Sequence, residues 1–273
     1  MYGQVEQVER LTRHMVRVDF GGEGLDGFIV DEWTDAYLCP LFLRPGAPYE
    51  PPFDYEWARK LPKEERPVPR RYTVRRWDPD ERRLTIDFVV HGDTGVAGRW
   101  AQHARAGDRL QLRGMPSGGY VPDARAESYL MVGDESALPA IAASLERLPA
   151  GARAVVVALV EAPGDELELD TRAELELTWL HRDGTADDEL LARTVADLHL
   201  PDRGTHAFVH GEAAETRAVR RHLLADRAIA PEALSCSPYW RRRYTDERWR
   251  EVKADWLREI AQDVPEPVTA ERS

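Results

Sequence analysis

Residues 128–148, with the sequence SYLMVGDESALPAIAASLERL, decide the fold of the C-terminal half of the chain. The segment begins with an apolar run, turns at Gly133 and Asp134, and continues as an alanine- and leucine-rich stretch. Pro139 falls at the start of that stretch, in the first turn of a helix, where the amide proton that proline lacks would have no partner. The segment therefore predicts a strand, a tight turn and a helix, with the turn at the carboxyl end of the strand.

The same alternation continues toward the C-terminus. Residues 153–162 (RAVVVALVEA) form the continuous apolar run that is typical of a strand buried on both faces. Residues 175–184 (LELTWLHRDG) predict a third strand, and residues 206–224 (HAFVHGEAAETRAVRRHLL) predict a fourth strand with its helix. Alternating strands and helices predict a parallel sheet whose loops at the strand carboxyl ends face a ligand, although no G-x-G-x-x-G motif occurs.

The N-terminal half has a different pattern. Residues 7–20 (QVERLTRHMVRVDF) alternate as a strand does, and residues 82–90 (RRLTIDFVV) place Leu84, Ile86 and Phe88 on one face. Turn signals separate such short strands, which predicts an antiparallel barrel or sandwich. The proline-rich stretch 43–69 predicts a long surface loop with one short helix at its centre.

Residues 245–263 (TDERWREVKADWLREIAQD) predict an amphipathic helix with Thr245 or Asp246 as its N-cap. Its apolar face carries Trp249, Val252, Trp256, Leu257 and Ile260. We expect this helix to dock on its own chain, with a partner interface as the alternative. The expected division is 1–125 (β domain), 126–244 (α/β domain) and 245–273 (helix and a frayed tail).

Composition excludes several classes of protein. The 273 residues carry a net charge of -12, which disfavours nucleic acid as a partner. The longest apolar run, 154–160, is far shorter than the roughly 20 residues of a membrane span, and the start lacks the apolar region of a signal peptide. Cys39 and Cys236 lie too far apart to suggest a zinc site or a disulfide framework. We therefore expect a cytoplasmic protein without membrane insertion, monomeric or weakly dimeric.

Four ordered blocks resemble a known family. They are RRYTVRRWD (70–78), DFVVHGDTGVAGRWAQHARAGD (87–108), VGDESALPAI (132–141), and VHGEAAETRAVRRHL (209–223) followed by YWRRR (239–243). In this order they resemble the siderophore-interacting proteins, FAD-containing ferric-siderophore reductases related to the ferredoxin-NADP reductases. The resemblance covers nearly the whole chain. It implies a Greek-key β-barrel that binds FAD, followed by an α/β domain like those that bind NAD(P)H.

The first block is similar to the flavin motif R-x-Y-[ST]. The resemblance implies that Arg70 holds the FAD pyrophosphate, that Tyr72 lies against the isoalloxazine ring, and that Thr73 bonds near the flavin N5, with Val74 also in contact. A guanidinium suits a pyrophosphate because it donates two parallel hydrogen bonds. The other arginines here are expected to be ordinary surface charges: Arg71, Arg75 and Arg76.

The second block implies that the barrel supplies further FAD contacts. By resemblance these are Asp87, Val89 and His91, with Gly95, Val96 and Ala97 opening a short helix whose amides face the pyrophosphate. The family usually has proline where this chain has Val96, and valine keeps its amide proton. His91 could instead be structural, and Trp100 is expected in the core.

The third block replaces the glycine-rich turn of dinucleotide-binding folds. By resemblance Asp134, Glu135, Ser136 and Ala137 lie over the flavin ring, where the nicotinamide arrives. A carboxylate pair disfavours a 2′-phosphate nearby, or it only caps the helix. NADH, NADPH and reduced ferredoxin all stay open as electron donors.

The fourth block implies that Tyr239 and Trp240 cover the flavin. Arg241, Arg242 and Arg243 then become candidates for binding the ferric complex, since such complexes are typically anionic. Alternatively, these arginines pair with the acidic residues that begin the terminal helix.

A further departure concerns the basic substrate site. The family often has lysine where this chain has Cys39, in AYLCPLFL (36–43). Lys60 and Lys63, in the long loop, are candidates to replace it.

The resemblance implies an FAD-dependent reductase that passes electrons from NAD(P)H, or from ferredoxin, to the iron of a ferric siderophore. The flavin carries the chemistry, so no catalytic acid or base and no resident metal site are expected. Hard oxygen ligands hold Fe(II) weakly, so reduction releases the iron. Two alternatives stay open: a flavoprotein that binds a siderophore or redox partner without turnover, and a nicotinamide-dependent reductase with another acceptor.

Overall fold

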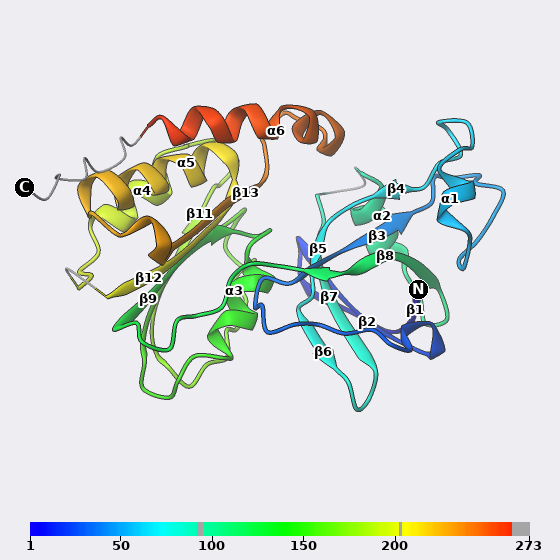
Figure 1. Ribbon diagram of the computed structural model, residues 1–273, viewed down its shortest axis with the longest axis horizontal. Coiled ribbons are helices and arrows are strands. Elements are labelled where there is room, and N and C mark those ends of the chain that lie inside the picture. Colours follow the sequence, from blue (N-terminus) through cyan, green and yellow to red (C-terminus); the bar gives the residue numbers. More distant parts are fainter. Residues whose placement is uncertain (92–94, 202–203, 264–273) are drawn as a thin grey trace, which may run out of the picture.

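Within residues 1–91, 95–201 and 204–263, which the computed structural model describes, the strands form an eight-stranded antiparallel sheet and a five-stranded parallel sheet (Figure 1). The expected fraying of the tail at 264–273 lies outside these residues. The antiparallel sheet contains β1 (Tyr2–Thr12), β2 (Met15–Gly21), β3 (Tyr37–Phe42), β4 (Val68–Pro69), β5 (Tyr72–Thr73), β6 (Arg76–Asp78), β7 (Arg83–Val89) and β8 (Arg109–Ser117). The expected order of a β domain, an α/β domain and a terminal helix is confirmed.

The antiparallel sheet closes around one apolar core. Its strand order is β4-β3-β8-β1-β2-β7-β6, with β5 paired to β3. Val74 N donates to Ala36 O at 2.7 Å and Arg75 N donates to Thr85 O at 3.0 Å, so the backbone after β5 connects the two edges. The predicted inner face of β7 is confirmed, because Leu84, Ile86 and Phe88 are fully buried.

Three helical segments cover the barrel: a 3-10 turn (Glu23–Leu25), α1 (Tyr55–Ala58) and α2 (Val96–His103). The short helix expected in the long loop is confirmed as α1, which Asp54 caps through the amides of Glu56 and Trp57. Trp100 of α2 packs on aromatic rings of the barrel core, as expected. The single strand expected over 7–20 is wrong, because the chain reverses at Arg13 and His14 and forms the β1–β2 hairpin.

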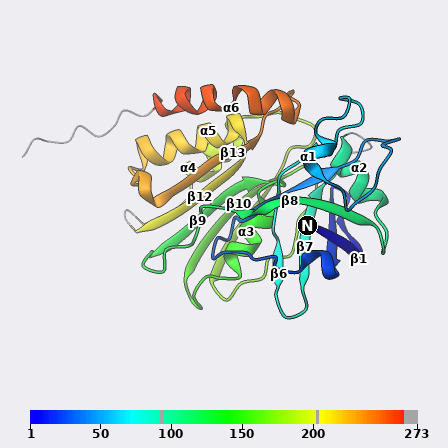
Figure 2. The same cartoon turned by 45° about the vertical axis from the view of Figure 1, so that its right-hand side comes forward.

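The parallel sheet has the order β11-β10-β9-β12-β13 and lies between helices. Its strands are β9 (Ser128–Asp134), β10 (Arg153–Val160), β11 (Glu174–His181), β12 (Thr205–Glu212) and β13 (Leu234–Trp240). Helix α3 (Leu138–Leu145) packs on one face, while α4 (Leu190–Ala196) and α5 (Ala213–Arg221) pack on the other (Figures 1 and 2). A π-helical turn (His222–Asp226) and a 3-10 turn (Pro231–Ala233) connect α5 to β13. The crossover direction reverses between β9 and β12, which makes their carboxyl ends the switch point where such sheets bind ligands.

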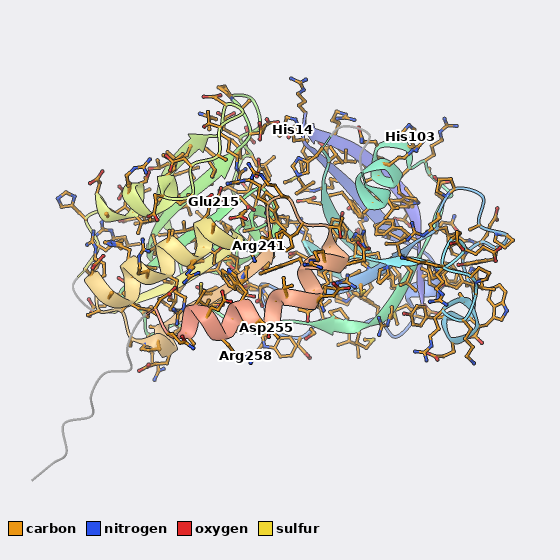
Figure 3. All side chains as sticks on the ribbon, turned by 90° about the horizontal axis from the view of Figure 1, so that it is seen from above. His14, His103, Glu215, Arg241, Asp255 and Arg258 are labelled. Atoms are coloured by element: carbon orange, nitrogen blue, oxygen red, sulfur yellow. The ribbon has the colours of Figure 1, made fainter. Side chains whose placement is uncertain are left out.

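Helix α6 (Asp246–Ala261) lies outside α5 and extends to the barrel (Figures 1 and 3). Thr245 caps it through the amide of Arg248, as one of the two expected N-caps. Trp249, Trp256 and Ile260 are buried against Ala213, so the expected docking on the same chain is confirmed. Leu257 is 39% exposed, which corrects its assignment to the apolar face.

The boundary expected near residue 125 stays a prediction, and it falls in the connection between β8 and β9. No helix in the described part of the chain is long and apolar enough to cross a bilayer.

Candidate functional site

Two glycines shape the switch point of the parallel sheet. A Cβ on Gly133 would lie 2.5 Å from the carbonyl oxygen of His210. Gly211 has a φ of +140°, and a Cβ there would lie 2.9 Å from Cγ of Asp134. The ends of β9 and β12 therefore approach each other more closely than any larger residue permits.

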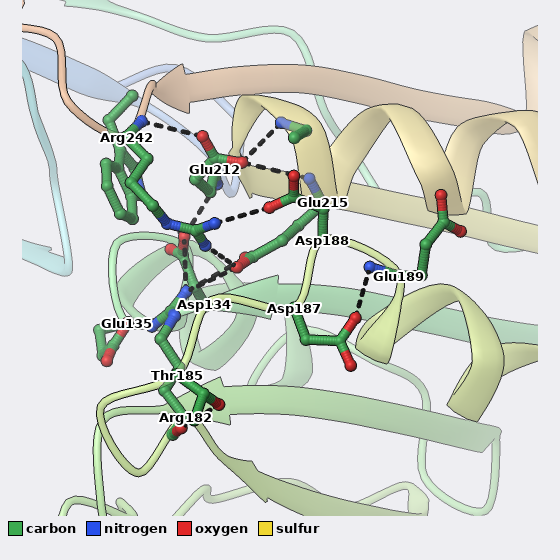
Figure 4. Close-up of polar contacts among 12 residues, drawn as sticks. Asp134, Glu135, Arg182, Thr185, Asp187, Asp188, Glu189, Glu212, Glu215 and Arg242 are labelled. Carbon is green, nitrogen blue, oxygen red and sulfur yellow. Dashed lines mark hydrogen bonds and ion pairs between the residues drawn. The ribbon is translucent and has the colours of Figure 1, made fainter.

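Asp134 is the centre of a hydrogen-bond network at this point (Figure 4). Its side chain is fully buried. Oδ1 accepts from the amide and hydroxyl of Ser136, and Oδ2 accepts from Glu212 N at 2.8 Å and from Trp240 Nε1 at 2.7 Å. Three separate segments are thus held by one carboxylate.

Buried carboxylates and arginines surround Asp134 (Figure 4). Arg182 Nη1 donates to Glu135 at 2.7 Å, and its Nη2 donates to Glu215 at 3.1 Å. Arg242 also donates to Glu215, at 2.7 Å. Glu212 caps α5 through the amides of residues 214 and 215. The switch point is therefore filled by side chains of the protein.

The acidity of this cluster reflects its burial. Burial raises the pKa of Glu215 to about 7, although the charge of Arg182 opposes the shift. Burial, together with the charge of Asp134, also raises the pKa of Glu135. Neither Asp134 nor Glu135 caps α3, whose N-cap is Ala137 and has no side-chain cap. Ala137 is fully buried in the core, which corrects its assignment as a cofactor contact.

Tyr239 and Trp240 lie at the end of β13, at the junction with the barrel. The Tyr239 ring lies 5.0 Å from that of His210. Burial raises the pKa of Tyr239, and Asp35 and Tyr37 of the barrel half add to the shift. The Trp240 ring faces the guanidinium of Arg182 at 5.9 Å.

The flavin-motif residues lie on and beside β5, next to α6. Arg70 Nη1 donates to Glu247 at 2.8 Å and to Asp246 at 3.4 Å. The Tyr72 ring lies 4.5 Å from Phe88, and burial raises the pKa of its hydroxyl. Thr73 is buried and pairs with Tyr37 of β3.

Some expected contacts serve the barrel instead. The side chain of Val74 belongs to the apolar core. Both oxygens of Asp87 are bonded to Arg17, at 2.7 and 2.8 Å. Both side chains therefore have partners within the barrel, and their contact with a cofactor stays a prediction. Val89 packs at the junction of the two halves, and the exposed His91 lies 6.5 Å from the ring of His14.

Of the remaining arginines of the first block, only Arg75 differs from the expectation of a surface charge. Arg75 is buried and donates to Glu146 of the α/β half at 2.5 Å, so its assignment as a surface charge is wrong. Arg76 is exposed, as expected, and contacts the same carboxylate. Arg71 is exposed and lies over the ring of Tyr37 at 5.8 Å.

A surface cavity of about 560 Å³ opens at the start of α2. Gly95, the N-cap of this helix, has a φ of +80° and, as glycine, offers no side chain to the amides of the first turn. Arg44 also lines the cavity, and its Nε is buried without a hydrogen-bond partner among the described residues. The N-terminal amides of a helix and a guanidinium nitrogen without a partner among the described residues fit the pyrophosphate of FAD. Val96 lines the cavity, whereas Ala97 is buried beneath it.

The expected substrate-binding arginines have separate environments. Arg241 stacks on Tyr244 and Trp249, at 4.6 and 5.9 Å. Arg242 is bonded to Glu215 and Asp188, and its assignment to the substrate stays a prediction. Arg243 is exposed. The acidic residues that begin α6 bind other arginines, so the alternative pairing is also wrong.

The lysine candidates and Cys39 lie on different parts of the barrel. Lys60 and Lys63 are exposed in the loop after α1. Cys39 is half-buried on β3; burial raises its pKa, and the charges of Arg250, Arg113 and Arg71 oppose the shift. This basic group of three arginines acts on Cys39 together with the opposing carboxylate of Asp246. The described residues contain no cluster of His, Cys, Asp or Glu that could hold a metal ion.

Several residues of the site were not predicted from the sequence. They are Arg44, Arg182, Glu212, Glu215, Asp246 and Glu247. Glu212 caps α5, but glutamate is not among the residues that usually mark an N-cap, so the sequence carries no clear signal for it. The others come together only through the tertiary fold.

Comparison with known proteins agrees with this geometry. Residues 4–120 match the model of the siderophore-interacting FAD-binding domain, and residues 126–243 match that of siderophore-interacting proteins. The ferric vibriobactin reductase of Vibrio cholerae is 32% identical over 245 residues, 89% of this chain and 90% of that protein. The NADPH-dependent ferric-chelate reductase of Escherichia coli is 32% identical over 239 residues, 86% and 91% of the two chains.

A solved structure has the same architecture. The siderophore utilization protein from T. fusca superimposes with a TM-score of 0.76 at 33% identity, over 90% of this chain and 94% of that one. Two adjoining family models and relatives aligned over most of their length leave one conclusion: the chain belongs to the siderophore-interacting protein family.

Proposed function

We propose that the protein is an FAD-dependent reductase of ferric siderophores that takes its electrons from a nicotinamide nucleotide. The observation that carries the proposal is the surface cavity at the N-terminus of α2, where the Nε of Arg44 has no partner among the described residues. The similarity to reductases named for ferric vibriobactin and ferric chelates supports the choice of substrate.

In this proposal the chain binds and orients the flavin and excludes water from it. Arg70, Arg44 and the amides of Gly95 and Val96 hold the pyrophosphate. Tyr72, Thr73 and Trp240 contact the ring system, and Asp134 fixes Trp240 through its indole nitrogen. Bound FAD would supply the redox chemistry, because a flavin accepts two electrons and can pass them on singly. No side chain of the protein then has to act as a general acid or base.

The basic group around Cys39 is our candidate for the anionic ferric complex. Arg71, Arg113 and Arg250 act together on this position, where the family often has lysine. Arg241 and Arg243 can extend the group, whereas Lys60 and Lys63 remain proposals that rest on the resemblance alone. A local positive cluster in a protein of net charge -12 both attracts and orients an anion.

A second candidate follows from the filled switch point. Four carboxylates, those of Asp134, Glu135, Glu212 and Glu215, lie where a nucleotide phosphate would have to approach. Because these side chains and their arginine partners fill the switch point, a donor that does not have to enter it, such as reduced ferredoxin, is the second candidate. If no donor reduces the flavin, the protein is a flavoprotein that binds the siderophore without turnover.

Anaerobic mixing distinguishes these functions. The protein reconstituted with FAD is mixed with NADH, NADPH or reduced ferredoxin, and the flavin absorbance is followed. We expect bleaching by at least one donor, then reoxidation by a ferric siderophore with Fe(II) captured by a chelating dye. Absence of bleaching with all three donors would overturn the reductase, and bleaching without reoxidation by ferric chelates would indicate another acceptor.

A further inference from the structure

Arg70 is held by two carboxylates from a distant part of the chain. Its Nη1 donates to Glu247 Oε1 at 2.8 Å, to Asp246 Oδ2 at 3.4 Å and to Pro69 O at 2.9 Å. The contact joins the barrel to the first turn of α6, 176 residues later in the chain. Two carboxylates on one guanidinium nitrogen present the same paired negative charge as a diphosphate.

We propose that Asp246 and Glu247 compete with the FAD pyrophosphate for Arg70, so that flavin binding and the docking of α6 on the barrel oppose each other. The inference rests on the proposed function, because it takes Arg70 as a pyrophosphate ligand. A shared arrangement would place two carboxylates and two phosphate charges beside one cation. Their mutual repulsion makes the two partners of Arg70 alternatives.

The first turn of α6 can leave the barrel while the helix stays in place. Arg250 provides a second link to the barrel, since it donates to Pro69 O at 3.0 Å and pairs with Asp246 at 2.7 Å. The rest of the helix is fixed to the α/β half by Trp249 and Trp256, and by the pair of Arg217 with Asp263. Releasing Arg70 therefore requires movement only of Asp246 and Glu247, which precede the buried Trp249.

FAD binding and the attachment of α6 to Arg70 weaken each other. If the carboxylates weaken FAD binding, FAD must weaken the attachment of the first turn by an equal factor. Riboflavin lacks the pyrophosphate, so neither effect should occur with it. FAD and riboflavin together therefore separate competition at Arg70 from a general loss of structure.

The test measures flavin affinity by quenching of flavin fluorescence on addition of the apoprotein. The variant D246N/E247Q removes both carboxylates. The matched control, E251Q/D255N, removes two exposed carboxylates of the same helix, each paired with an arginine three residues away (Asp255 is labelled in Figure 3). We expect the variant to lower the Kd of FAD by about twofold to fivefold, within the range for exposed ion pairs. The Kd of riboflavin should not change, and the control should bind both flavins as the wild type does.

A second readout follows α6 directly. Trypsin cleaves after Arg243 and Arg248, which lie on either side of Asp246 and Glu247. FAD should accelerate this cleavage in the wild type, whereas riboflavin should not, and D246N/E247Q should be cleaved rapidly without any flavin. In an R70A background the carboxylate variant should no longer change the Kd of FAD.

The outcomes are distinguishable. A protein that binds FAD with the same Kd in the wild type, D246N/E247Q and control overturns the competition but leaves the proposed function intact. A wild type that binds riboflavin and FAD equally overturns the role of Arg70 and the competition together. A wild type that binds no flavin at all overturns the proposed function itself.

Discussion

Asp134 fixes the position of more groups at the site than any other side chain that we describe. It accepts from Ser136, Glu212 and Trp240 while being fully buried. Asn at this position would bring an amide donor against groups that already donate. We expect D134N to lower the free energy of unfolding by about 2–3 kcal/mol, measured by urea denaturation.

The matched comparison is S136A. It removes a hydroxyl that donates to the same carboxylate and leaves the other bonds in place. We expect a loss of about 1 kcal/mol from this variant. If D134N were as stable as S136A, the central role of the carboxylate would be wrong.

Glu215 makes the stability of the protein depend on pH. Its pKa is raised to about 7 in the folded protein, mainly by burial, against an ordinary value of 4.5. Between these values the folded state binds more protons than the unfolded state, so stability falls as the pH rises. The loss amounts to at most about 3 kcal/mol.

The variant E215Q should remove this dependence. Urea unfolding at pH 5 and pH 8 should show a larger fall in stability for the wild type than for E215Q. The difference between the two proteins cancels titrations that they share, such as that of His210. Equal falls in both proteins would contradict the raised pKa of Glu215.

At single positions the sequence predicts the functional role of a residue better than it predicts the side chains that the residue contacts. The motif containing Arg70 and Tyr72 could be recognised from residue types alone. Alternation along a strand places Asp87 on a face but does not reveal that Arg17 lies opposite it. Arg75 was assigned to the surface for the same reason, since its partner Glu146 is 71 residues away.

Helix α6 shows which face of an element carries its docking energy. Trp256 is buried with its ring 5.6 Å from Trp249, while its neighbour Leu257 is exposed. We expect W256A to weaken the docking of α6 by about 3 kcal/mol. Tryptic cleavage within the helix should then accelerate by up to about a hundredfold, since 1.4 kcal/mol is tenfold in a local equilibrium.

The control lies one residue away. L257A removes an apolar side chain from the solvent face, and alanine and leucine both favour a helix. The L257A variant should therefore be cleaved at the rate of the wild type. Equal acceleration in both variants would show that α6 is held by something other than its tryptophan face.

Element type was predictable where burial is uniform. Strands β9 and β10 are buried along almost their whole length, and their apolar runs predict them directly. Strand β13 was missed because it is a half-buried edge strand that contains Pro238. The β1–β2 turn was missed because Arg13 and His14 are not among the residue types that usually form turns.

The two halves of the molecule are connected by buried charge as well as by apolar contacts. Arg75 of the barrel is bonded to Glu146, at the C-cap of α3, and its side chain is 9% exposed. We expect R75A to cost about 2–3 kcal/mol, because it leaves a partly buried carboxylate without its main partner. Urea unfolding measures the loss.

Arg76 offers an internal comparison, since it contacts the same carboxylate at 3.3 Å with 62% of its side chain exposed. We expect R76A to change stability by less than about 1 kcal/mol. Similar losses for R75A and R76A would argue against a buried link between the halves.

The arrangement of the whole protein explains why its site was only partly predictable. The barrel contributes Arg70 and α2, the parallel sheet contributes Asp134 and Trp240, and α6 contributes Asp246 and Glu247. Each group follows from local sequence or from resemblance, but their meeting depends on how the two sheets pack.

Electron transfer from the reduced flavin to a ferric siderophore can be measured in a single mixing experiment. The FAD-loaded protein is photoreduced without oxygen and mixed in a stopped-flow instrument with a ferric siderophore or with its gallium analogue, in the presence of an Fe(II)-trapping dye. We predict that the ferric complex restores the oxidised flavin spectrum with one Fe(II) per electron, whereas gallium, which has the same charge and no accessible reduction, leaves the flavin reduced. A flavin that stays reduced with the ferric complex would contradict the proposal that the protein is a ferric-siderophore reductase.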